Sequence, residues 1–281
     1  MSARPAPLRT EPTAAPASAA RERGGAPKAA ILAVTSGKGG VGKTFFSANL
    51  AAALARRGER VLVLDADLGL ANLDVVLNLH PKLTLHDVFT GKATLEQAIL
   101  PAPGGFSVLL AGSGLVEYSR LTPQVREQLV DIIDQVAPRF DRILLDTGAG
   151  ISDVVLHAIS LADDVLVIAT PEPTSMTDAY ATIKLLAIQQ GRRAIKLVVN
   201  QVSMTGEGRR VRDQLQLVVD RYVCPNLNGG NSAAVSLDMM GEIPTDWSVR
   251  EAVQRRTLLL ELMPGAAAAL AVVAIAGRMG L

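Results

Sequence analysis

The chain has little of three residue classes, and each scarcity argues against a kind of function. It contains one cysteine, Cys224, so no internal disulfide can form, and a metal cluster that needs two cysteines per subunit is disfavoured. Only 3% of the residues are aromatic, which argues against platforms that stack single-stranded bases. The net charge of +1 gives the whole protein no field that would draw it to nucleic acid or membrane. The three histidines have no metal-site spacing: His80, His86 and His157.

The first 29 residues differ in composition from the rest of the chain. They consist mainly of Ala, Pro, Arg, Ser and Glu without apolar periodicity, which predicts a disordered tail at residues 1–29. They lack the continuous apolar stretch of a secretory signal, and a transit peptide is disfavoured because four prolines would break its helix. We therefore expect one folded domain over residues 30–281, in the reducing cytosol that a single cysteine fits.

From residue 30 onward, short apolar runs alternate with helical patterns. Strands are expected at 30–35, 60–65, 105–111, 142–146, 164–170, 194–200 and 237–243. Helices are expected at 43–57, 94–99, 123–137, 152–162, 175–190, 208–221, 249–255 and 266–279, and residues 224–236 are expected to form a loop. Several strands are apolar at successive positions, which is typical of strands buried on both faces. The alternation predicts an α/β fold with a doubly wound, mostly parallel sheet and helices on both faces.

Residues 37–44, GKGGVGKT, match the phosphate-binding loop pattern G-x-x-x-x-G-K-[ST] in full. They lie between an apolar run and a helical pattern, in the order that phosphate binding needs. Glycines let the backbone N–H groups converge on phosphate oxygens, and the following helix adds its positive dipole end. Lys43 can reach the β- and γ-phosphates, and the Thr44 hydroxyl can bind Mg²⁺. The predicted nucleotide-binding residues of the loop are Gly37, Lys38, Gly39, Gly40, Val41, Gly42, Lys43 and Thr44.

Three carboxylates follow apolar strand patterns. Asp65 and Asp67 come at or just after the end of one strand, and Asp146 ends another. Taken alone, each acid is more often a helix cap or turn residue. Beside a phosphate loop, they supply what a hydrolytic site needs, a group that orients water and groups that hold the metal. The sequence therefore predicts slow, Mg²⁺-dependent ATP hydrolysis, with residues 68–74 and the glycines at 148 and 150 as two switch segments.

These motifs resemble those of the MinD/ParA family of deviant-loop ATPases. The resemblance is carried by GKGGVGKT with its extra Lys38, by DADLGLANLD at 65–74 and by Asp146. Within this group the sequence is most similar to flagellar number and placement regulators. That similarity is carried by LHPKLTLHDVFTG at 79–91, LLDTGAGISD at 144–153, TPEPTSMTDAYATIK at 170–184 and IPTDWSVREAVQRR at 243–256. It covers roughly residues 30–262 and implies a P-loop NTPase domain of the SIMIBI type.

The resemblance also implies residue roles. Lys38 would cross the interface of an ATP-bound homodimer and contact the partner's phosphates. Lys43 would bind the phosphates of its own protomer, and both lysines would take part in catalysis. Asp67 would position the attacking water, while Thr44, Asp65 and Asp146 would support the Mg²⁺ ion. ATP would give the dimer, and hydrolysis would release monomers. The implied adenine contacts are Asn200, which reads the base edge, and the 243–246 loop with Ile243, Pro244 and Asp246.

The partners implied by the resemblance are a signal-recognition-type flagellar GTPase (FlhF-like), a flagellar transcription activator and the membrane. The expected location is the bacterial cytoplasm, with peripheral contact at the inner membrane or cell pole. Residues 1–29 lack the Asp-Gln-Ala element with which family members stimulate the GTPase, so the resemblance does not extend to activation of that partner. The 266–281 segment is apolar nearly all round, with Arg278 its only charge. It therefore reads first as a buried helix and second as a membrane-surface helix.

Several other functions remain open. A septum-placement MinD would have arginine where this chain has Ala71. A DNA-partition ATPase would need a basic surface, for which the sequence offers Arg192, Arg193, Arg209, Arg210, Arg212, Arg255 and Arg256; we interpret these as solvated helix ends and loops. A nucleotide-binding scaffold or metal-cluster carrier is weakened by the single cysteine. A small-molecule kinase would need an acceptor-site base, which the sequence does not reveal.

Overall fold

The computed structural model describes residues 28–69, 72–112, 121–227 and 234–279. Their centre is an eight-stranded sheet with the order β3-β4-β2-β5-β1-β6-β7-β8. All neighbours pair in parallel except β3 and β4, which are antiparallel at one edge. The strands are β1 (Ala30–Ser36), β2 (Val61–Ala66), β3 (Ile99–Pro101), β4 (Ser107–Leu109), β5 (Arg142–Ala149), β6 (Asp164–Ala169), β7 (Ala194–Val202) and β8 (Ser236–Pro244).

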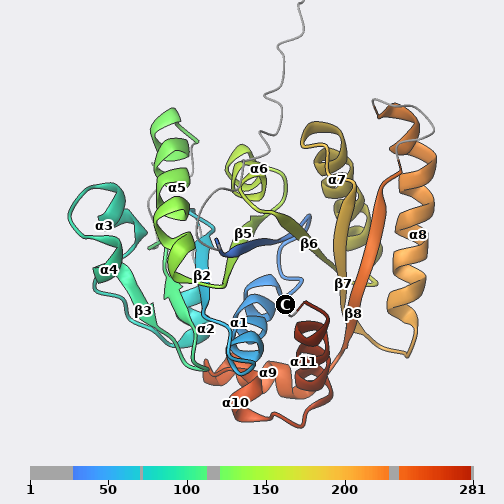
Figure 1. The fold of residues 1–281 in the computed structure, drawn as a ribbon. Coiled ribbons are helices and arrows are strands. Elements are labelled where there is room, and N and C mark those ends of the chain that lie inside the picture. Colours follow the sequence, from blue (N-terminus) through green and yellow to red (C-terminus); the bar gives the residue numbers. More distant parts are fainter. Residues whose placement is uncertain (1–27, 70–71, 113–120, 228–233, 280–281) are drawn as a thin grey trace, which may run out of the picture.

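Helices cover both faces of the sheet (Figure 1). They are α1 (Lys43–Ala55), α2 (Leu73–Leu77), α3 (Leu85–Phe89), α4 (Leu95–Ala98), α5 (Pro123–Val136), α6 (Asp153–Ser160), α7 (Pro173–Gln189), α8 (Glu207–Tyr222), α9 (Trp247–Arg255), α10 (Leu259–Leu262) and α11 (Ala267–Met279). Two short 3-10 helices, η1 (Ala137–Arg139) and η2 (Cys224–Asn226), complete the described elements.

The alternation of side chains along the strands divides the core in two. In β2, Leu62 and Leu64 join the core under α5 to α8, whereas Val61 and Val63 join the core with α1, α10 and α11. Both sets are almost fully buried, because successive residues of a strand point to opposite faces. The doubly wound α/β fold predicted from the sequence is therefore confirmed.

The structure departs from the sequence prediction mainly at the β3 edge. The expected helix 94–99 ends at Ala98, and the chain continues as the short antiparallel strand β3, which was not predicted. The expected strand 105–111 is paired only over Ser107–Leu109. Helices α2, α3 and α10 were also missed, because four or five residues are too few to display a helical period.

Some expectations fall outside the described residues. These include most of the predicted tail, Ala71 in the first switch segment and residues 228–233 of the predicted loop. At the boundary of the tail, Ala29 is buried and its N–H donates to the carbonyl of Ala137, 3.0 Å away. The remainder of the predicted loop includes η2 and the first residue of β8.

The C-terminal helix α11 packs against β8 and α1. Its buried residues are Ala268, Ala269, Val272, Ile275, Ala276 and Met279, as expected for a helix that belongs to the core. Within the described ranges, no helix has the length and apolar character needed to cross a membrane.

Candidate functional site

The loop between β1 and α1 has a backbone that only glycine suits at two points. Gly42, the residue before α1, has φ 95°, and a Cβ there would lie 2.6 Å from the Asn200 side-chain nitrogen. At Gly37 a Cβ would lie 2.1 Å from the carbonyl oxygen of Asp178 in α7. Gly42 therefore permits a left-handed turn at the start of α1, and Gly37 permits the close approach of α7.

Lys43 is held inside this loop. It is 8% exposed, and its ammonium group donates to Ser36 Oγ at 3.0 Å. Ser36 in turn donates to the carbonyl of Lys38 at 2.7 Å, so one buried hydroxyl contacts both loop lysines. Burial lowers the pKa of Lys43, while the negative charges of Asp146 and Asp67 oppose that shift.

Two buried carboxylates lie side by side at the carboxyl ends of neighbouring strands. Asp65 in β2 and Asp146 in β5 are register partners and are 1% and 2% exposed. Burial raises the pKa of Asp146 to about 6, against the hydrogen bonds from Thr44 and Ser47 and the charge of Lys43. Burial also raises the pKa of Asp65 well above its usual value, and the neighbouring Asp146 adds to this shift.

The arrangement fits Mg²⁺ bound with a nucleotide. A divalent cation would relieve the repulsion between these carboxylates, and the Thr44 hydroxyl hydrogen-bonds to Asp146 on the same side. The described residues contain no cluster of three or more His, Cys, Asp or Glu that would hold a metal alone. Mg²⁺ usually takes one or two carboxylates and completes its shell with phosphate oxygens and water, which the phosphate loop is built to place here.

Asp67 directly precedes the first predicted switch segment and lies close to Gly148 of the second. Its backbone N–H donates to Asp65 Oδ1 at 3.1 Å, which fixes the turn after β2. A Cβ at Gly148 would lie 3.3 Å from an Asp67 carboxylate oxygen, so the second segment approaches closely. A cavity of about 500 Å³ runs along the phosphate loop, with Lys43, Thr44, Asp67 and Gly148 in its wall. The loop, the metal-side acids and the proposed water-positioning acid are thus brought together.

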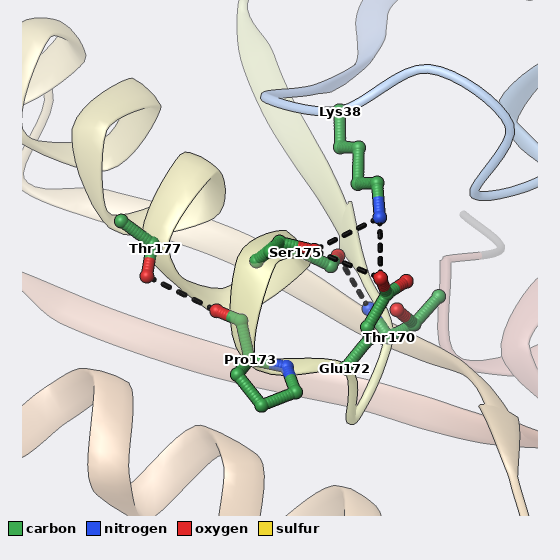
Figure 2. A network of polar contacts seen from close by, with 7 residues as sticks. Lys38, Thr170, Glu172, Pro173, Ser175 and Thr177 are labelled. Atoms are coloured by element: carbon green, nitrogen blue, oxygen red, sulfur yellow. Dashed lines mark hydrogen bonds and ion pairs between the residues drawn. The ribbon is translucent and has the colours of Figure 1, made fainter.

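The Lys38 side chain points toward the start of α7 (Figure 2). Its ammonium nitrogen lies 2.6 Å from Glu172 Oε1 and 2.9 Å from Thr174 Oγ1. The Thr174 hydroxyl also donates to Glu172 at 2.9 Å, and these contacts lower the pKa of Glu172. Sequence reasoning did not assign Glu172 and Thr174 to the site. The only signal was their place in the 170–184 stretch that carried the family resemblance.

Of the four residues expected at the adenine, one contacts the phosphate loop, and the other three lie at the end of β8 and the start of α9. Asn200 donates to the carbonyl of Val41 at 2.8 Å, so it lies directly against the phosphate loop. Ile243 is a core residue, while the Asp246 carboxylate accepts from Ser248 N and Ala268 N and thereby joins the starts of α9 and α11. Among the described residues that line the cavity, neither Asn200 nor the 243–246 loop occurs. Their contact with adenine remains a prediction.

Comparisons with known proteins agree with this geometry. A family model described as an AAA domain matches residues 29–197. The chain is 42% identical to "Antiactivator FleN" of Pseudomonas aeruginosa over 249 residues, 89% of this chain and 85% of that protein. It is 33% identical to the flagellum site-determining protein YlxH of Helicobacter pylori, over 83% of this chain and 76% of that protein. The structure of septum site-determining MinD of Pyrococcus horikoshii, complexed with Mg-ADP, superposes with a TM-score of 0.71. The two chains are 25% identical over 89% of this chain and 96% of that one.

Proposed function

The chain belongs to the MinD/ParA family of ATPases, and from this membership we propose that it is an ATP-dependent dimerisation switch that regulates the number or placement of flagella. The observation that carries the proposal is that the phosphate loop and Asp67 line one cavity, with Asp146 hydrogen-bonded to Thr44 in the wall of that cavity. The flagellar assignment is supported by YlxH, which is named a flagellum site-determining protein, and regulation is supported by FleN, which is named an antiactivator. Both similarities extend over more than four fifths of the chain.

The site residues divide the work of a slow hydrolysis. Thr44, Asp65 and Asp146 would hold Mg²⁺, which would supply a positive charge against the developing charge on the phosphates. Lys43 would bind the β- and γ-phosphates. Asp67 orients the attacking water, since it lies at the wall of the cavity and is positioned through its backbone bond to Asp65. Lys38 completes the partner protomer's site, which explains why a lysine that the loop pattern does not require is present.

The proposed partners follow from the same membership. A second copy of the chain binds in the ATP state, and the complex acts on a flagellar GTPase or a flagellar transcription activator from the bacterial cytoplasm or the inner membrane surface. Of the partner effects, restraint of an activator is supported best, because the FleN relative is described as an antiactivator. The missing Asp-Gln-Ala element in residues 1–29 argues against stimulation of the GTPase.

DNA partition is a weaker alternative, because several of the arginines it would need are already engaged. Arg192 donates to three backbone carbonyls around the end of α6. Arg212 pairs with Asp213 at 3.0 Å, and Arg255 pairs with Glu251 at 2.6 Å. These contacts favour the interpretation of the arginines as helix-end and surface residues. Septum placement is the second alternative within the family, and its discriminating position, Ala71, lies outside the described residues.

The proposal is tested by deleting the gene in its native host and counting flagella per cell by electron microscopy. We expect extra or misplaced flagella, which the wild-type gene restores and the Lys43→Ala gene does not. The variant's failure to bind ATP is checked by calorimetry on the purified protein, and its level in the cell is matched by immunoblot. An unchanged flagellar pattern would contradict the flagellar assignment, and tight ATP binding by Lys43→Ala would contradict the assignment of the loop.

A further inference from the structure

Two exposed apolar side chains follow the carboxyl ends of β7 and β8. Met204 is 61% exposed, and Trp247, the only tryptophan of the chain, is 72% exposed. The two strand ends are joined, since Val202 and Pro244 are register partners and the N–H of Thr245 donates to the carbonyl of Val202 at 2.8 Å. The two connections therefore leave the sheet side by side, one into α8 and the other into α9 (Figure 1).

This apolar pair has no task in the fold or in the proposed ATPase chemistry. Among the described residues, Met204 and Trp247 belong neither to the two cores nor to the lining of the phosphate-loop cavity. Tryptophan is one of the residue types that contribute most to the energy of protein interfaces. Large apolar side chains that gather on a surface, unlike single scattered ones, mark an interaction site.

Three arginines lie next to this pair and face solvent. Arg209 and Arg210 lie in the first turn of α8 and Arg250 lies in the first turn of α9, and all three are exposed. Within the part of the chain that the structure describes, their guanidinium groups form no ion pair or hydrogen bond. Because α8 and α9 cover opposite faces of the sheet, the arginines flank Met204 and Trp247 on both sides.

The carboxylates near the pair are less exposed than these arginines and are already engaged. Three of them accept hydrogen bonds from backbone N–H groups at or just before the starts of α8, α9 and α11, and a fourth pairs with an arginine of its own helix. They are Glu207, Glu242 and Asp246, and Glu251. The first three offset the positive ends of the helices, so the charge that this surface offers a ligand is that of the three arginines.

We propose that Met204, Trp247 and the three arginines form a docking surface for an acidic polypeptide segment that carries apolar side chains. Apolar side chains of the segment would cover the exposed pair, and its carboxylates would complement the arginines. A second copy of this chain fits less well, because a two-fold contact here would set the arginines of the two protomers against each other. Duplex DNA would use the arginines and leave the apolar pair without a partner. The docking needs no nucleotide and does not rest on the proposed function.

The test is a titration of the full-length, nucleotide-free protein with a dye-labelled synthetic peptide of about 16 residues, followed by fluorescence anisotropy. The peptide carries leucine and phenylalanine on one helical face and glutamate elsewhere. Two companion peptides replace every glutamate with lysine, or every leucine and phenylalanine with alanine. We expect saturable binding of the acidic peptide and about tenfold or greater loss of affinity for each companion. Unlabelled acidic peptide should shift the emission of Trp247 to shorter wavelength, because the indole loses contact with water.

Variants assign the binding to this surface. Trp247→Ser should weaken the acidic peptide about tenfold, and Arg250→Gln should weaken it about two- to fivefold. Two matched controls lie further along α8, Leu217→Ser at a side chain that is 67% exposed and Arg221→Gln at an exposed cation. Both controls should keep the affinity of the wild type. Thermal unfolding of all four variants shows whether each has kept its fold.

The possible results separate this proposal from its alternatives. Absence of saturable binding, equal binding of the lysine peptide, or full affinity in a folded Trp247→Ser variant would overturn it. Tighter binding of duplex DNA or of phosphatidylglycerol vesicles than of the acidic peptide, weakened by Arg250→Gln, would overturn it in favour of a phosphate ligand. Nucleotide-free dimerisation that Trp247→Ser abolishes would overturn it in favour of a second copy. A protein that binds the acidic peptide but not ATP contradicts only the proposed function.

Discussion

The contact between Lys38 and Glu172 allows a direct test of dimerisation. In this structure Lys38 is held within its own protomer by Glu172 and Thr174 at the start of α7 (Figure 2). The proposed function requires the same ammonium group to reach the phosphates of a second protomer. Both contacts must therefore break before the dimer can form, and Glu172→Gln removes the charge of the stronger one while it preserves the size of the side chain.

The expected size of the effect of Glu172→Gln follows from how exposed the Lys38–Glu172 pair is. The Lys38 and Glu172 side chains are 33% and 56% exposed, so solvent screens their attraction. Exposed pairs of this kind shift an equilibrium by about two- to fivefold. We therefore expect Glu172→Gln to lower the ATP concentration at half-maximal dimerisation by that factor. Thr174→Val, which removes a neutral hydrogen bond, should act in the same direction and less strongly.

The assay is sedimentation velocity over a series of ATP concentrations, with Asp67→Ala in all samples so that ATP is not consumed. Thr177→Val is the matched control, because Thr177 lies in the same helix and donates to the Pro173 carbonyl without touching Lys38 (Figure 2). It should leave the midpoint unchanged. A Glu172→Gln midpoint equal to or above that of the wild type would refute the reasoning, since Glu172 would then not hold Lys38 back.

Three further outcomes are expected. Asp67→Ala should bind ATP and stay dimeric while phosphate release falls to background, and normal turnover would remove Asp67 from its role. Gly42→Ala should weaken ATP binding in calorimetry, because φ 95° costs about 1–2 kcal/mol and its Cβ would meet Asn200. Gly58→Ala, at φ 90° with open space around it, is the control that should keep the affinity. Asp246→Ala should lower the free energy of unfolding by about 1–2 kcal/mol at pH 7, because the carboxylate caps α9. Hydrogen bonds, first from the side chain of Ser248, hold the pKa of Asp246 below 3.8. Its contribution is therefore full above that value, and the difference from wild type in urea unfolding should shrink as the pH falls through the lower folded pKa. A difference that grew in acid would contradict this.

The parts of the site that are local in sequence could be predicted well. The phosphate loop is one continuous pattern, and the acids that follow apolar runs were expected at one edge of the sheet, where Asp65 and Asp146 are indeed register partners. Contacts between distant segments could not be predicted. Ser47 donates to Asp146 across 99 residues at 2.8 Å, and no local pattern marks that pairing. The short elements around β3 were missed for the related reason that a few residues show no period.

The sequence by itself determined the fold class and the nucleotide-binding loop, because strand runs, helix periods and a phosphate loop are properties of neighbouring residues. Only the tertiary structure decided which distant groups meet. It placed Glu172 against Lys38 across 134 residues and Asn200 against the phosphate loop across 159. These juxtapositions depend on strand order and on how closely α7 and β7 approach the loop, and neither is encoded in any single stretch of the chain.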